Sequence, residues 1–141
     1  MDIKLLIVRI GSGLLGLIAL ISGGKAIWGG IDAHLGEVAA TLDPNVLNFM
    51  DNEYRFFAGV WLLIGFALII GSLLIHKKPD LIQVGLEAVF VGGIARVIGA
   101  MEYGLLRETT IAIAIEIIAP IVLLVLFKIA TKSSAKDAAN A

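Results

Sequence analysis

The sequence contains no cysteine, and this absence excludes disulfide bonds, thiolate nucleophiles and thiolate metal ligands. It contains only two histidines, His34 and His76, in stretches that should face opposite sides of a membrane. We therefore do not expect a histidine-based metal or acid–base site within one protomer. Charged residues are also scarce, at 16%, and the formal net charge is −1. Such a chain lacks the basic surface that nucleic-acid binding requires.

The residue patterns of the common enzyme classes are missing as well. The sequence shows no nucleophile paired with a base, no metal-binding triad and no loop that would cradle a phosphate. The sequence therefore favours a non-enzymatic protein, and we expect no cofactor apart from the cation considered below.

Apolar residues make up 59% of the 141 residues, compared with about 45–50% in soluble domains. Four apolar runs are each long enough, at about 20 residues, to cross the roughly 30 Å hydrocarbon core of a bilayer as a helix. They are residues 5–27, 56–75, 81–101 and 110–127. The sequence therefore predicts an all-α fold, an integral membrane four-helix bundle of residues 1–131, followed by a disordered polar tail at residues 132–141. Because the first run carries Arg9 and is too long for the apolar region of a signal peptide, we expect it to be retained as a helix.

Lysine and arginine residues beside the four runs predict the orientation of the chain. One side of the membrane carries Lys4, Lys77, Lys78, Lys128, Lys132 and Lys136, and the other carries Lys25, Arg55 and Arg107. Since basic residues are enriched in cytoplasmic flanks, this bias places both termini in the cytoplasm.

The connections between the runs differ in length. The segment at 76–80 is a tight turn in which Pro79 should start the third helix. In contrast, the connection between the first and second runs is a long outer loop, residues 28–52, in which Asp43 and Pro44 have the pattern of a helix N-cap followed by the first helical residue. A loop of this length is often functional, although a simple cover over the helix ends is the reading that we favour.

The third run carries two charges, Glu87 and Arg96, at membrane depth. Nine residues separate them, so on a helix they point to roughly opposite sides and cannot pair with each other. Each therefore needs a partner from another helix, because an unpaired charge within a bilayer is costly. Matching depths across the predicted topology suggests two ion pairs, a structural pair of Arg9 with Glu87 and a second pair of Arg96 with Glu116.

Glycine lies on the same side of the third run as the arginine. Gly85, Gly92 and Gly99, together with Tyr103, fall within about 60° of Arg96 on a helix. The glycines either serve close packing of helices alone or leave room for a ligand beside Arg96.

Pro120 lies four residues after Glu116 and should bend the fourth helix there. A freed backbone carbonyl beside a buried carboxylate resembles the start of a polar cavity near the outer face. The candidate ligand-pocket residues are Arg96, Glu116, Arg55, Glu53, Asn52, Glu102 and Tyr103. A structural network of salt bridges built on the same residues is the alternative.

The outer side of the predicted bundle collects acidic residues. Asp51, Glu53 and Glu102 could together bind a divalent cation such as calcium, because hard cations prefer several carboxylate oxygens. Their spacing matches no known cation-binding loop.

Two stretches carry a family resemblance. They are NEYRFFAGVWLLIG at residues 52–65 and GGIARVIG at residues 92–99, and they resemble the small bacterial four-helix membrane proteins of the DUF4345 type, catalogued as a domain of unknown function. The matching positions are Glu53, Arg55, Gly59, Arg96 and Gly99. The first run, with Arg9, Gly16 and the GGK segment at residues 23–25, is also similar to the broader DoxX-like superfamily.

This resemblance implies a four-helix bundle in the bacterial inner membrane, a homo-oligomer with a trimer favoured, and a pocket that opens outward. It implies an association with envelope permeability and no settled activity. The resulting hypothesis is a non-enzymatic envelope protein whose pocket binds a lipid or small amphiphile. The alternative is a small proton-coupled transporter that uses Glu87 or Glu116, although small multidrug exporters carry their carboxylate in the first helix, where this chain has Arg9 and Lys25.

Overall fold

The computed structural model describes the backbone of residues 2–105 and 107–139, and within these ranges the side chains except those at 108 and 133–139. All the regular elements in this described part are helical. They are α1 (Ile3–Gly29), α2 (Asp32–Leu35), the 3-10 helix η1 (Gly36–Thr41), α3 (Pro44–Leu73), α4 (Pro79–Tyr103) and α5 (Arg107–Ala139). Four of them, α1, α3, α4 and α5, are long and apolar enough to cross a membrane. The all-α class and the four predicted spans are confirmed, and the chain is a multi-pass membrane protein.

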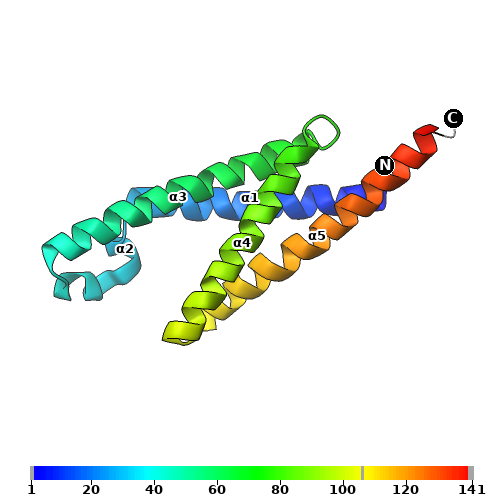
Figure 1. The fold of residues 1–141 in the computed structure, drawn as a ribbon. Coiled ribbons are helices and arrows are strands. Elements are labelled where there is room, and N and C mark those ends of the chain that lie inside the picture. Colours follow the sequence, from blue (N-terminus) through cyan, green and yellow to red (C-terminus); the bar gives the residue numbers. More distant parts are fainter. Residues whose placement is uncertain (1, 106, 140–141) are drawn as a thin grey trace.

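The four long helices form two helical hairpins. In Figure 1, α1 and α3 run side by side, and α4 and α5 form a second hairpin that is inclined to the first. The hairpins join because α3 packs against α4 and α1 packs against α5, so that α1 and α4 lie diagonally across the bundle. Both termini lie at one end of the molecule, which we call the termini end. The opposite end, which carries α2, is called the loop end.

The apolar core lies in the half of the bundle nearest the termini. Its fully buried members come from all four long helices: Val8 of α1, Leu68 of α3, Ile82, Leu86 and Val89 of α4, and Ala130 of α5. Burying aliphatic side chains between helices gains dispersion contacts that lipid chains supply less completely. The two hairpins are therefore held together mainly at the termini end.

Small residues let α1 and α3 approach closely. A methyl group built at Gly16 would lie 2.9 Å from the carbonyl oxygen of Gly65, and one built at Gly65 would lie 2.9 Å from the carbonyl oxygen of Gly16. Backbones at this distance leave no space for a side chain. Gly16 and Gly65 therefore allow the backbones of α1 and α3 to pack in direct contact.

The hairpins separate toward the loop end. Near the termini, a methyl group at Gly71 would collide with Ile82, and one at Gly85 would collide with Leu68. Farther along α4, methyl groups at Gly92 and Gly99 would meet nothing within 4 Å in the part of the chain that the structure describes. Gly85 therefore serves packing against α3, whereas Gly92 and Gly99 border open space.

The predicted helix starts are confirmed. Asp43 is the N-cap of α3, where its carboxylate accepts a hydrogen bond of 2.8 Å from the backbone N–H of Asn45, and Pro44 is the first helical residue. Pro79 begins α4.

The long loop is partly helical, because α2 and η1 lie within it. The helix α5 continues through the buried Pro120.

The C-terminal segment differs from its expected form. The backbone of residues 132–139 continues α5 as a helix, in contrast to the disordered tail predicted from its small and polar composition. Residues 140 and 141 lie outside the described part. The domain boundary at residue 131 stays a prediction.

Candidate functional site

A cavity of about 430 Å³ lies where the two hairpins separate. All four long helices contribute to its walls, and we call it the hairpin cleft. The polar or aromatic residues that line it are Ser22, Tyr54, Phe57, Trp61, Arg96 and Glu116. Most of the remaining lining is apolar. A largely apolar cavity of this size with a few polar groups has the usual character of a site for a small molecule.

Arg96 and Glu116 form an ion pair in the hairpin cleft. The distance from Arg96 Nε to Glu116 Oε2 is 2.9 Å, and the pair joins α4 to α5. Gly93, three residues before Arg96, makes this contact possible, because a methyl group there would lie 3.1 Å from Glu116 Cβ. The pairing predicted from equal depth is confirmed.

The two members of this pair differ in exposure. The Arg96 side chain is 53% exposed, whereas the Glu116 side chain is 12% exposed. Both residues lie seven positions from the loop end of their spans, which end at Tyr103 and Thr109. At a rise of about 1.5 Å per residue, this is a depth of about 10 Å. A half-exposed guanidinium therefore stands well inside the length of helix that can cross the membrane.

The pair leaves hydrogen-bonding capacity unused. Glu116 Oε2 is buried and makes no hydrogen bond within the described residues, although Arg96 Nε is near it. Attraction between the opposite charges at 2.9 Å holds the pair. The Nη atoms of Arg96 also have no partner within the described residues, and a guanidinium offers five N–H donors in all. The cleft thus presents donors and one acceptor that a bound molecule could satisfy.

Trp61 faces the same cleft from the first hairpin. Its indole Nε1 donates a hydrogen bond of 2.9 Å to Ser22 Oγ, and Ser22 Oγ in turn donates to the carbonyl oxygen of Ile18 at 2.7 Å. The sequence did not mark Ser22, Tyr54, Phe57 or Trp61 as pocket residues. A signal was present, because the aromatic positions 54, 57 and 61 are spaced by three and four and so share one face of a helix.

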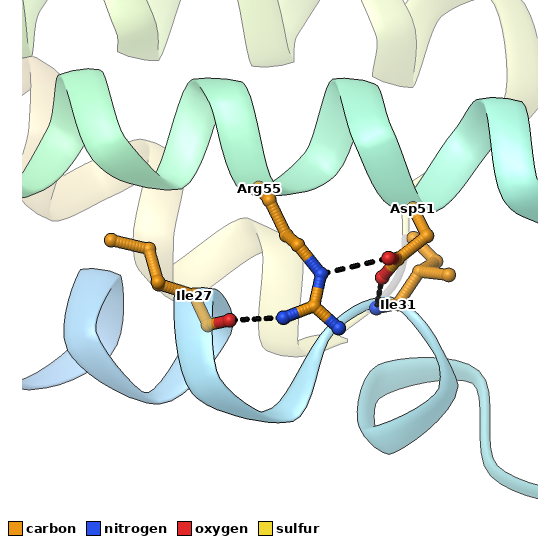
Figure 2. Close-up of polar contacts among 4 residues, drawn as sticks. All are labelled: Ile27, Ile31, Asp51 and Arg55. Atoms are coloured by element: carbon orange, nitrogen blue, oxygen red, sulfur yellow. Dashed lines mark hydrogen bonds and ion pairs between the residues drawn. The ribbon is translucent and has the colours of Figure 1, made fainter.

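Arg55 lies outside the hairpin cleft, contrary to the expected pocket. Figure 2 shows that its guanidinium points to the end of α1, where Nη1 donates to the carbonyl oxygen of Ile27, while Nε lies 2.7 Å from Asp51 Oδ2. Asp51 Oδ1 accepts a hydrogen bond of 2.7 Å from the backbone N–H of Ile31. Together Arg55 and Asp51 tie α3 to the turn that follows α1, and we call them the turn clamp.

The remaining expected pocket residues are dispersed on the surface. Asn52, Glu53, Glu102 and Tyr103 are exposed, and none of them lines the hairpin cleft. No three histidine, aspartate or glutamate side chains among the described residues are grouped so that they could hold a metal ion. Asp51, Glu53 and Glu102 are accordingly not assembled as cation ligands, because Asp51 is engaged in the turn clamp.

The expected pair of Arg9 with Glu87 is not formed within the described residues. Glu87 is exposed and accepts a hydrogen bond of 2.9 Å from Gln83 Nε2 on its own helix. The physical reason is the arrangement of the helices, since α1 packs against α3 and α5 and lies diagonally across from α4. Equal depth alone did not make Arg9 and Glu87 neighbours.

The fold and the cleft define a multi-pass membrane protein with four long helices and an arginine–glutamate pair that joins α4 to α5. Residues 7–127 match the family model described as "Domain of unknown function (DUF4345)", and the chain belongs to this family. No curated protein and no solved structure matches the chain.

Proposed function

We propose that this protein is a non-enzymatic envelope protein of the bacterial inner membrane that binds a lipid or small amphiphile in the hairpin cleft and so influences envelope permeability. The observation that carries the proposal is the half-exposed Arg96, at membrane depth beside an apolar cavity of about 430 Å³. In the orientation with cytoplasmic termini, the cleft opens in the outer half of the bilayer.

The energetics of Arg96 support a bound amphiphile. An arginine within a bilayer is costly unless its donors find partners, and Glu116 occupies only the Nε side of this guanidinium. An amphiphile brings oxygen acceptors on one end and an apolar chain on the other. The acceptors suit the Arg96 Nη atoms, and the chain suits the apolar walls that Phe57, Val60 and Ile64 contribute.

A homo-oligomer, with a trimer favoured, is part of this proposal. The open space beside Gly99, which does not line the hairpin cleft, gives a second copy room to approach α4 closely. Native mass spectrometry of the detergent-solubilised protein reports the number of subunits and the mass of any retained lipid in one measurement. A monomer under conditions that preserve bound lipid contradicts the oligomer.

The binding test compares Arg96→Gln with a matched control, Arg107→Gln, which removes an exposed arginine at the start of α5. We expect Arg96→Gln to lower lipid retention about tenfold, as loss of a charged hydrogen bond of about 1.4 kcal/mol does, and Arg107→Gln to leave retention unchanged. In Arg96→Gln the buried Glu116 carboxylate loses its partner, which could unfold the protein. The double variant Arg96→Gln/Glu116→Gln removes this carboxylate as well, so that lost retention in it does not arise from an unpaired buried charge. Retention equal to that of the unmodified protein in both Arg96 variants rejects the proposal.

A proton-coupled transporter is the second candidate, and the structure favours Glu116 over Glu87 for it. Glu116 is buried in the cleft, whereas Glu87 is exposed and bonded to Gln83. The test is solute flux into proteoliposomes under a pH gradient, with Glu87→Gln as the control for Glu116→Gln. Flux no greater than that of empty vesicles rejects the transporter.

A further inference from the structure

A second cavity, of about 840 Å³, lies at the loop end of α1. We call it the loop-end cavity. Its lining includes Lys25, Trp28, His34 and Tyr54. The loop-end cavity shares three lining residues with the hairpin cleft, namely Ser22, Ala26 and Tyr54. The two cavities are therefore neighbours along α1 and α3, and one elongated molecule could occupy both.

The charges of the combined lining are unequal. Arg96 and Glu116 balance each other, and Lys25 forms no ion pair within the described residues. Because these three are the acidic and basic side chains among the residues that line the two cavities, apart from His34, the combined lining carries one uncompensated positive charge at Lys25. An anionic group is the complement of such a site.

Three side chains that carry hydrogen-bond donors line the loop-end cavity. Lys25 brings an ammonium group, His34 an imidazole N–H and Tyr54 a phenolic O–H. The imidazole of His34 stacks on the ring of Tyr54 with a centroid distance of 5.6 Å, so these two side chains are held against each other. Several donors on separate side chains suit the tetrahedral oxygens of a phosphate better than the two coplanar oxygens of a carboxylate.

The depths of the charged groups match the layers of a lipid. Lys25 lies four residues before the end of α1 at Gly29, which is about 6 Å along the helix, whereas Arg96 lies about 10 Å from the end of α4. A phospholipid likewise places its phosphate nearest to water and its ester oxygens a few ångströms deeper. Trp28, beside Lys25, is almost fully exposed, as is usual for tryptophan at the level of lipid headgroups.

We propose that the loop-end cavity is a headgroup subsite and that the ligand is a phospholipid with one net negative charge. Its phosphate lies at Lys25, His34 and Tyr54, its ester oxygens accept hydrogen bonds from the Arg96 Nη atoms, and one acyl chain lies in the hairpin cleft. This inference rests on the proposed function, because it assumes that the cleft holds an amphiphile.

The experiment is native mass spectrometry of the full chain released from vesicles of equal parts phosphatidylglycerol and phosphatidylcholine with identical acyl chains. These lipids share the phosphate and the chains but differ in net charge. We expect about fivefold enrichment of phosphatidylglycerol in the retained lipid, the effect of one lysine at a lipid surface. Lys25→Gln should abolish the enrichment, because the variant lacks the cation that favours the lipid with a net negative charge. The matched control Lys128→Gln, an exposed lysine at the termini end, should keep it.

The outcomes separate this inference from the proposed function. Lipid retained without preference, or enrichment lost equally in Lys25→Gln and Lys128→Gln, overturns the headgroup subsite and leaves the amphiphile cleft standing. No lipid retained by the unmodified protein overturns both. A parallel sample with inorganic phosphate added to the vesicles tests whether the subsite binds a lipid phosphate or free phosphate. If the amount of retained phosphatidylglycerol is unchanged, the result supports the lipid. If added phosphate displaces phosphatidylglycerol, the subsite is assigned to free phosphate and the lipid assignment is overturned.

Discussion

Arg96 and Glu116 lie 2.9 Å apart, yet the arginine side chain is 53% exposed and the glutamate side chain only 12%. The two halves of the pair are therefore not equivalent. Removing the arginine leaves a buried negative charge without a partner, whereas removing the glutamate leaves a cation that can still extend toward water or headgroup oxygens.

This asymmetry predicts unequal losses of stability. We expect Arg96→Gln to lower the free energy of unfolding by about 2–3 kcal/mol, because the Glu116 carboxylate stays buried and uncompensated. Glu116→Gln should cost only about 1 kcal/mol, since Arg96 is half exposed. Chemical unfolding of both variants in one detergent measures the difference. Equal losses, or a greater loss for Glu116→Gln, contradict this account of the pair.

The turn clamp predicts a local effect on the connection between α1 and α3. Arg55→Gln removes the bond to the Ile27 carbonyl and the partner of Asp51, so the turn after α1 loses its tie to α3. Hydrogen exchange should become faster at Gly30 and Ile31 by about a factor of ten, which corresponds to about 1.4 kcal/mol of lost local stability. The control is Glu53→Gln, an exposed neighbour on the same helix. Equal acceleration in the control argues against the clamp.

Gly30 and Gly36 offer a matched comparison in the same loop. Both have positive φ, 66° at Gly30 and 58° at Gly36, but only at Gly30 would a methyl group collide with Arg55 and Asp51. Gly36→Ala should therefore cost about 1–3 kcal/mol from backbone strain alone, and Gly30→Ala about 1–3 kcal/mol more from the collision. Thermal unfolding of the two variants gives the difference, and indistinguishable midpoints argue against the contact.

The close approach of α1 and α3 predicts that Gly65 tolerates no side chain. A methyl group there lies 2.9 Å from both the Gly16 carbonyl oxygen and the Leu20 amide nitrogen, and backbone atoms cannot move aside as side chains do. We expect Gly65→Ala to destabilise the protein by about 1–3 kcal/mol. Gly59→Ala, on the same helix but facing open space, should be neutral or slightly stabilising, because alanine favours helix over glycine. Unfolding in detergent compares the two variants. Similar stability of Gly65→Ala and Gly59→Ala would contradict the close approach of α1 and α3 at Gly65.

The hydrogen bond between Trp61 and Ser22 can be tested by a double-mutant cycle. Trp61→Phe keeps an aromatic ring and removes the indole N–H, and Ser22→Ala removes the acceptor. We expect a coupling of about 0.6 kcal/mol, the average for side-chain hydrogen bonds between membrane helices. A coupling of zero in unfolding measurements contradicts a bond across the α1–α3 interface.

Several features of the fold were predictable because they depend on local sequence. The spans follow from run length, and the start of α3 follows from Asp43 and Pro44, whose side-chain chemistry acts within one turn. The pair of Arg96 with Glu116 was predictable from depth, since α4 and α5 are consecutive and antiparallel, so equal depth brought them together.

The candidate site was less predictable because rotation about each helix axis decides it. Arg55 and Trp61 are six residues apart on α3, which is about 240° of rotation, so they face different neighbours. Trp61 faces the hairpin cleft and Arg55 faces the end of α1. The sequence-based prediction used membrane depth alone and therefore placed Arg55 in the same pocket as Arg96.

The sequence by itself determined the class, the four spans, the helix starts and the need of each buried charge for a partner, because run length, capping chemistry and desolvation act on residues close together in the chain. Only the tertiary structure decided which helices are neighbours. It set α1 diagonally from α4, so Arg9 and Glu87 remain unpaired with each other within the described residues, and it separated the hairpins at the loop end. Which helices become neighbours depends on how whole helix faces pack, with Gly16 against Gly65 and Gly85 against Leu68. Such contacts join residues far apart in the chain, so membrane depth and spacing along one helix do not predict them.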